Sequence, residues 1–102
     1  MNKFESARFV VTFKSRLSAD SADYGAMAEK MRSLAEAHDG YLGMDSVRGE
    51  DGIGISISYW RDWESIVRWK HHADHLVAKK LGRERWYEDY CVKIAEVRDP
   101  PP

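Results

Sequence analysis

The segment from Ile53 to Trp60 constrains the fold of this chain most strongly, because two kinds of residue alternate strictly along it. Isoleucines and a tyrosine occupy the odd positions, whereas glycine, serines and the final tryptophan occupy the even ones. Successive side chains of a β-strand point to opposite faces of a sheet. The alternation therefore predicts a strand over residues 53–60. The small residues on its second face predict a hollow above the sheet, with Trp60 at one end.

The rest of the chain predicts three further strands and two helical regions. Residues 9–14 and 86–98 alternate with a period of two, and residues 41–48 also favour a strand. Apolar side chains recur at helical spacing over residues 24–38, and the following Asp39-Gly40 is typical of a helix end. Asp62 predicts the start of a helix that runs through about His72, with a second helical stretch over residues 74–81.

This order, β-α-β-β-α-β, predicts an α+β ferredoxin-like fold with an antiparallel sheet. The length of 102 residues predicts a single domain over residues 1–102, with its core at about 7–98 and a proline-rich tail at 99–102. Two helices would cover only one face of such a sheet. We therefore expect a homodimer in which a second copy covers the other face.

Composition excludes several classes of partner. Sixteen basic and 17 acidic residues give a net charge of -1, which offers no electrostatic attraction for nucleic acid or a membrane surface. The apolar runs are too short for a signal peptide or a membrane span, so we expect a cytoplasmic protein. The single Cys91 excludes an intramolecular disulfide, and we expect it to be buried.

Residues 59–75 contain three of the four tryptophans and three of the four histidines. Positions three apart share a face of a helix, so Trp69, His72 and His75 would form one stripe. Two interpretations are open: the stripe packs into the core, or it lines a pocket that holds a ligand. His71 would face solvent, and His38 would lie at a helix C-terminus.

A pocket of this composition suits proton transfer from an aromatic substrate. An imidazole with a pKa near 6.5 can take a proton from a phenol or hydroquinone at neutral pH, and the resulting anion can react with oxygen. His72 and His75 are therefore the candidate catalytic residues, with Arg85 or Lys79 able to stabilise the oxyanion. The candidate substrate-binding residues are those expected to wall the hollow: Trp60, Trp69, Trp86, Tyr90 and Ser56. Only one of Tyr87 and Tyr90 can point inward.

The series His71-His72-x-x-His75 also raises the possibility of a metal site. Three imidazoles could in principle bind zinc. Adjacent helical positions diverge by about 100°, however, so the three rings cannot converge on one ion while the helix stays regular. We therefore predict no metal site.

Three segments together resemble the antibiotic biosynthesis monooxygenase-like family: "RFVVTFK", "YGAMAEKMRSLAEAHDGYLGMDSVR" and "GIGISISYWRDWESIVRWKHHADHLVAKKLGRERWYEDYCVKIAEV". The resemblance runs from about Arg8 to Val97. Its specific positions are Tyr59-Trp60, Ile66, Trp69, His72, His75, Gly82, Trp86-Tyr87, Tyr90 and Val97. It implies a dimeric α+β barrel with a pocket between sheet and helices. The family includes cofactor-free, quinone-forming monooxygenases and haem-degrading monooxygenases.

The chain departs from the catalytic patterns of both groups. The strand-ending tryptophan of the cofactor-free oxygenases matches Trp60. Their asparagine four residues earlier falls on Ser56, and their tyrosine six residues later falls on Ile66. The tryptophan of the haem-degrading relatives matches Trp69, but their first-strand asparagine has no counterpart here and their histidine falls on Lys79.

These observations predict a monooxygenase of this family that acts on a small planar aromatic or quinol-like substrate. The substrate would bind in a pocket lined by tryptophan and histidine, without metal or flavin. The alternative is a non-catalytic dimer of the same fold that binds haem or another small apolar ligand.

Overall fold

The computed structural model describes residues 5–18, 24–79 and 87–102. Its elements run in the expected β-α-β-β-α-β order. They are β1 (Phe9–Leu17), α2 (Tyr24–Glu36), β2 (Tyr41–Arg48), β3 (Ile53–Trp60), α3 (Trp63–Lys79) and β4 (Tyr87–Glu96). None of the helices in these ranges is long and apolar enough to cross a membrane.

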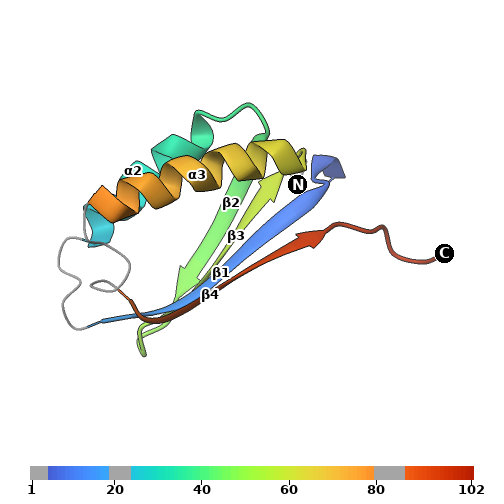
Figure 1. Ribbon diagram of the computed structural model, residues 1–102. Helices are drawn as coiled ribbons and strands as arrows, with labels where there is room; N and C mark the ends of the chain where they lie inside the picture. Colours follow the sequence, from blue (N-terminus) through green and yellow to red (C-terminus); the bar gives the residue numbers. More distant parts are fainter. Residues whose placement is uncertain (1–4, 19–23, 80–86) are drawn as a thin grey trace.

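The four strands form one antiparallel sheet in the order β2-β3-β1-β4. Both helices lie on the same face of this sheet (Figure 1). The ferredoxin-like prediction is therefore confirmed. Figure 1 also shows the last residues of the chain leaving the sheet beyond β4.

A tight turn joins β2 to β3. The backbone N–H of Gly49 donates to the carbonyl of Ile53 across 2.9 Å, and that of Gly52 donates to the carbonyl of Gly49 across 3.0 Å. Gly52 has a φ of 84°, a conformation that costs glycine little and most other residues considerably more. The turn therefore fixes the register of the hairpin, in which Arg48 pairs with Gly54.

Helix α3 begins as predicted but runs further without interruption. The Oδ1 atom of Asp62 accepts a hydrogen bond of 2.8 Å from the backbone N–H of Ser65, which is the expected N-cap. The helix then continues unbroken through Lys79, so the expected division between His72 and Asp74 is wrong. The residue between them is Ala73. Alanine has the highest helix propensity of all residues, so it favours continuation of the helix.

The core lies between the helices and the sheet. Its buried members are Val11 of β1, Ala35 of α2, Trp60 of β3 and Ile66 of α3. Half-buried hydrophobic residues pack around them: Phe9, Tyr41, Trp69 and Ile94. The even-numbered side of β3, which ends in Trp60, therefore faces the helices.

The opposite face of the sheet has no helix over it among the described elements (Figure 1). Ile55 on this face is 39% exposed, and Val47, which pairs with it across the strands, is 74% exposed. Cys91 belongs to the same face, because both it and Ile55 pair with Lys14. Cys91 is exposed, so its predicted burial is wrong: the residue lies on the side that the helices leave uncovered.

Candidate functional site

Two tryptophans meet between the end of β3 and the middle of α3. The ring centroids of Trp60 and Trp69 lie 5.3 Å apart, with an angle of 43° between the ring planes. Tyr41 also approaches Trp60 in an edge-on arrangement, with ring centroids 5.5 Å apart. Trp60 is 0% exposed, whereas Trp69 is half-buried. Trp60 therefore lies behind Trp69 as seen from the solvent.

The N–H group of Trp60 is fully engaged within the protein. It donates a hydrogen bond of 2.9 Å to the hydroxyl oxygen of Ser58, which is itself buried. Residues two apart on a strand share a face, so the sequence contains the signal for this pair. Sequence reasoning nevertheless missed Ser58, because it treated this serine only as a small residue beside the hollow.

The N–H group of Trp69, in contrast to that of Trp60, forms no hydrogen bond with the described residues. Its Nε1 atom is buried and meets no hydrogen-bond acceptor in the described parts of the chain. A buried donor without a partner costs about 1–3 kcal/mol, and native structures contain few of them. Among the described residues, this nitrogen is therefore a buried hydrogen-bond donor without an acceptor, inside an apolar cluster.

Arg48 occupies part of the hollow that the small residues of β3 predict. Its guanidinium donates to the carbonyl of Gly52, to the carbonyl of Ser15 at 3.2 Å and to the hydroxyl of Ser15 at 2.8 Å. A Cβ atom on Gly54 would lie 2.5 Å from the Arg48 Cζ atom. The space above Gly54 is therefore filled by arginine, which the pairing of Arg48 with Gly54 brings there.

Ser56 and Tyr90, two of the predicted binding residues, also lie on the helix side of the sheet. The hydroxyl of Ser56 is 2.7 Å from that of Ser46 on the neighbouring strand. The ring of Tyr90 stacks on Phe13 with a centroid distance of 6.0 Å. Trp86, the remaining predicted tryptophan, falls outside the described residues.

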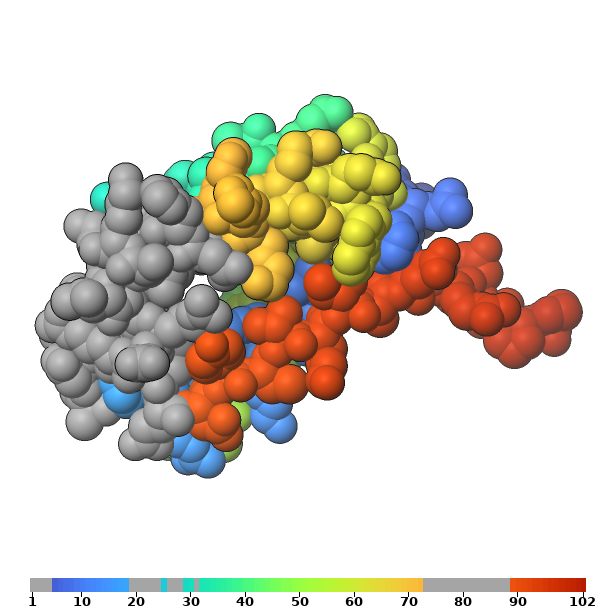
Figure 2. Space-filling model, in the orientation of Figure 1, coloured from blue at the N-terminus to red at the C-terminus, as the bar shows by residue number. Residues whose placement is uncertain are grey.

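A recess separates α3 from β4, and β1 is visible at its floor (Figure 2). Apolar side chains remain exposed on both bordering elements. They are Trp63 and Val67 on α3, and Tyr90 and Val92 on β4. Concave apolar surfaces with few polar groups are typical of sites for small organic ligands.

The histidines gather on the side of α3 that faces α2. The ring of His72 lies 5.3 Å from that of His38 and 6.3 Å from that of His71. His72 is exposed. Burial lowers the pKa of His38 below 6.5, and the nearby charges of His72 and Arg68 lower it further. His75 belongs to α3, but its side chain is outside the described part.

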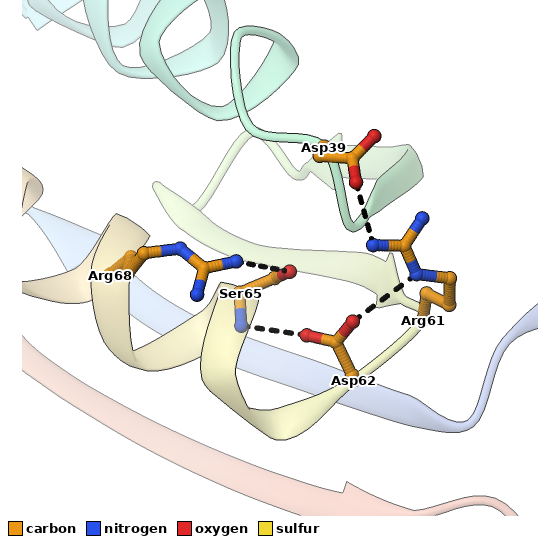
Figure 3. A network of polar contacts seen from close by, with 5 residues as sticks. All are labelled: Asp39, Arg61, Asp62, Ser65 and Arg68. Carbon is orange, nitrogen blue, oxygen red and sulfur yellow. Dashed lines mark hydrogen bonds and ion pairs between the residues drawn. The ribbon is translucent and has the colours of Figure 1, made fainter.

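A polar network anchors the start of α3, the helix that carries Trp69 (Figure 3). Arg61 bridges Asp39 at 2.8 Å and Asp62 at 3.2 Å. Arg68 donates a 3.1 Å hydrogen bond to the hydroxyl of Ser65. Hydrogen bonds from Ser65 hold the pKa of Asp62 below its usual value. The network ties the chain after α2 to the first turn of α3.

The side chains that the structure describes form no cluster of metal ligands. Among them, no group of three or more histidine, cysteine, aspartate or glutamate residues is placed to hold an ion. The polar groups of this region that can form hydrogen bonds are an indole N–H, serine hydroxyls and imidazoles. Such groups bind and orient an organic molecule by hydrogen bonding, and an imidazole can also accept a proton.

Sequence comparison identifies a family and two relatives. The family model described as "Monooxygenase af470-like" matches residues 10–96. The uncharacterized protein YqjZ of Bacillus subtilis is 45% identical over 93 residues, which cover 91% of this chain and 82% of that protein. Jasmonate monooxygenase ABM of Pyricularia oryzae is 32% identical over 94 residues, covering 87% of this chain. The matched part is 43% of that longer protein.

Solved structures share the fold at low sequence identity. Rv0793 from Mycobacterium tuberculosis superposes with a TM-score of 0.74 at 14% identity, covering 94% of this chain and 100% of that chain. SnoaB from Streptomyces nogalater, a cofactor-independent oxygenase, gives a TM-score of 0.71 at 12% identity. The match covers 94% of this chain and 98% of that one.

Proposed function

Because the chain belongs to the af470-like monooxygenase family, we propose that it is a monooxygenase whose small organic substrate binds between α3 and β4. The observation that carries this proposal is the recess of Figure 2, whose bordering elements expose Trp63, Val67, Tyr90 and Val92. Flat rings and branched aliphatic groups on facing walls suit a planar, largely apolar molecule. A quinol-like or anthrone-like aromatic compound meets this description.

The reaction needs neither metal nor flavin if the substrate supplies the electrons. An activated methylene group loses a proton, and the resulting carbanion or enolate transfers electrons to dioxygen. Overall, one methylene group and one molecule of dioxygen give one carbonyl group and one molecule of water. One oxygen atom enters the product and the other leaves as water, so atoms and electrons balance without a further reductant. The protein has to bind the substrate, accept the proton and stabilise the developing oxyanion.

The proton acceptor in this proposal is an imidazole on α3. His72 is our first candidate, and His75, at the next turn, is the second. His72 is exposed and lies beside His38, on the side of α3 that faces α2. Its role therefore requires a substrate that extends from the recess past Trp69 to that side of the helix. Tyr90 and Trp69 contact the substrate, with Ser56 and Trp86 contributing to the same pocket. Trp60 lies behind Trp69 and keeps that ring in place.

Oxygen consumption tests the activity directly. The protein is dialysed against a chelator and mixed with a panel of anthrones and dihydroxynaphthalenes in an oxygen electrode. We expect uptake that exceeds autoxidation, that survives the chelator and that falls at least about tenfold in His72→Ala or His75→Ala. Tight binding of a panel member without oxygen uptake would favour the alternative of a ligand-binding protein. No uptake with any member would overturn the proposed substrate class.

We also propose that the protein is a homodimer in which the open sheet faces meet. The support is the exposure of Ile55 and Val47 on a face that no described helix covers. Light scattering on a chromatography column should give about twice the 11.8 kDa of one chain. Ile55→Asp should yield monomers, whereas Val67→Asp, the same kind of change on α3, should leave the dimer intact. A monomeric wild-type protein at micromolar concentration would contradict this proposal.

A further inference from the structure

The two tryptophans that meet in the core differ in what their N–H groups can do. An indole nitrogen donates one hydrogen bond and accepts none. Trp60 has used its donor on Ser58 at 2.9 Å. The donor of Trp69 is buried and has no acceptor among the described residues.

The core cluster beside Trp69 explains why the described residues do not satisfy this donor. The core residues against which Trp69 packs are Val11, Ala35, Trp60 and Ile66. Their side chains contain no hydrogen-bond acceptor. A lone buried water usually needs two or more polar partners, and this cluster offers few. A ligand oxygen atom that reached the Nε1 atom of Trp69 would meet the requirement.

We propose that Trp69 binds the substrate through a hydrogen bond from its Nε1–H to a carbonyl or phenolic oxygen. This inference rests on the proposed function and narrows its substrate class. The ligand must be planar and must carry an oxygen acceptor where its ring meets α3. A hydrocarbon of the same shape would leave the donor unsatisfied and would bind less well.

The same bond contributes to the reaction. When the substrate loses its proton, negative charge accumulates on the oxygen that Trp69 contacts. A donor already held in place stabilises this charge more than it stabilises the neutral substrate. Trp69 is therefore a catalytic residue that acts by hydrogen bonding. The strand-ending Trp60 cannot do so while Ser58 holds its N–H.

Two matched ligands and two matched variants test the inference. The probes are 1-naphthol and naphthalene, which differ by one hydroxyl group. Trp69→Phe removes the N–H but keeps a ring, and Trp63→Phe does the same at an exposed position of the same helix. Trp69→Phe should weaken 1-naphthol binding about tenfold and naphthalene binding less than about twofold. Trp63→Phe should change both affinities by the same factor.

The indole N–H resonances give an independent readout. A protein labelled with nitrogen-15 should show four indole signals, one for each tryptophan, and Trp69→Phe identifies the signal of Trp69. Bound 1-naphthol should shift that signal downfield while the Trp60 signal stays in place. Bound 1-naphthol should also ionise at a lower pH in the wild type than in Trp69→Phe.

The outcomes separate this inference from the proposed function. Equal losses for both probes in Trp69→Phe, or an unshifted Trp69 signal in a bound complex, would overturn the role of Trp69 even if oxygen is consumed. A second outcome is a shifted Trp69 signal and a selective loss of 1-naphthol affinity in Trp69→Phe, without oxygen uptake by the wild type. This outcome would support the role of Trp69 and contradict the proposed monooxygenase activity. If neither probe binds at all, the inference fails.

Discussion

The hydroxyl of Ser58 accepts the N–H of Trp60 across 2.9 Å, and both groups are buried on the helix side of β3. This bond satisfies a donor at the centre of the core. It also removes Trp60 from the set of residues that can bind a ligand oxygen. Ser58 therefore satisfies the indole N–H of Trp60, whereas the neighbouring N–H of Trp69 has no acceptor among the described residues.

Replacing Ser58 with alanine should leave the Trp60 N–H buried without an acceptor. We expect the free energy of unfolding to fall by about 1–3 kcal/mol, because a buried donor then loses its partner. Urea unfolding measures this change. Ser56→Ala is the matched control: its hydroxyl pairs with Ser46 in an exposed position, so its loss should be under about 1 kcal/mol. If the free energy of unfolding falls equally in Ser58→Ala and Ser56→Ala, the hydrogen bond to Trp60 stabilises the protein no more than an exposed one does.

Gly40 should not tolerate a side chain. A Cβ atom there would lie 2.0 Å from the hydroxyl oxygen and 2.4 Å from the Cβ atom of Ser65. Gly40→Ala must therefore push the start of α3 away from the chain that follows α2, and we expect a loss of at least about 2 kcal/mol. Gly25→Ala, in a helix with open space around it, should be neutral or stabilising by up to about 1 kcal/mol. A Gly40→Ala protein as stable as the wild type would contradict the packing described here.

The pair His38 and His72 predicts a loss of stability in mild acid. The pKa of His38 is lowered in the folded protein by burial, and secondarily by His72 and Arg68. Unfolded His38 therefore binds protons more readily than folded His38. The contribution to stability is complete above about pH 6.5 and is lost as the pH falls through that value toward the lower folded pKa.

His38→Gln should reduce the loss of thermal stability between about pH 7.5 and about pH 5.5. The measurement is the change in unfolding temperature across this interval in wild type and variant. His71→Gln is the control, because His71 is exposed and its ring contact is with His72. If the unfolding temperature of His38→Gln falls across this pH interval as much as that of the wild type, other groups cause the acid sensitivity.

Tyr59 should resist ionisation. Tyr59 is 3% exposed and donates a 2.8 Å hydrogen bond to Asp45. Burial first, and Asp45 second, raise the pKa of Tyr59 to about 12. The neutral phenol is favoured in the folded state, so its contribution to stability holds below about pH 10 and is lost as the pH rises toward about 12.

Ultraviolet titration of phenolate absorbance can resolve this group. We expect one tyrosine of the five to ionise near pH 12. Asp45→Asn should lower the pKa of Tyr59 part of the way toward the ordinary value of about 10. Tyr59→Phe should abolish that late step. If all tyrosines ionise together at about pH 10 in the folded protein, the contact between Tyr59 and Asp45 is not as described.

Local sequence signals were sufficient for the fold. The alternation from Ile53 to Trp60 and the cap at Asp62 each depend on neighbouring residues, and both are confirmed. The break expected after His72 was wrong because it assumed a stop signal where Ala73 favours a helix. The exposure of Cys91 depends on which face the helices cover, which periodicity alone does not specify.

The candidate site was harder to predict, because its features arise between distant segments. Arg48 reaches the space above Gly54 only through the register of the hairpin. His38 meets His72 only when α2 packs against α3. Sequence reasoning placed Trp60 and Trp69 near one pocket, and the structure brings these two rings together. It could not predict which of these two indoles would have no acceptor among the described residues.

The most direct test of this account follows the oxygen atoms. The chelator-treated protein is incubated with an anthrone under isotopically labelled dioxygen, and the product is examined by mass spectrometry. We predict that the wild type inserts one labelled oxygen atom into each product molecule, and that Trp69→Phe does so at least about tenfold more slowly. A product whose new oxygen comes from water, or a wild-type rate no higher than autoxidation, would contradict the proposed monooxygenase.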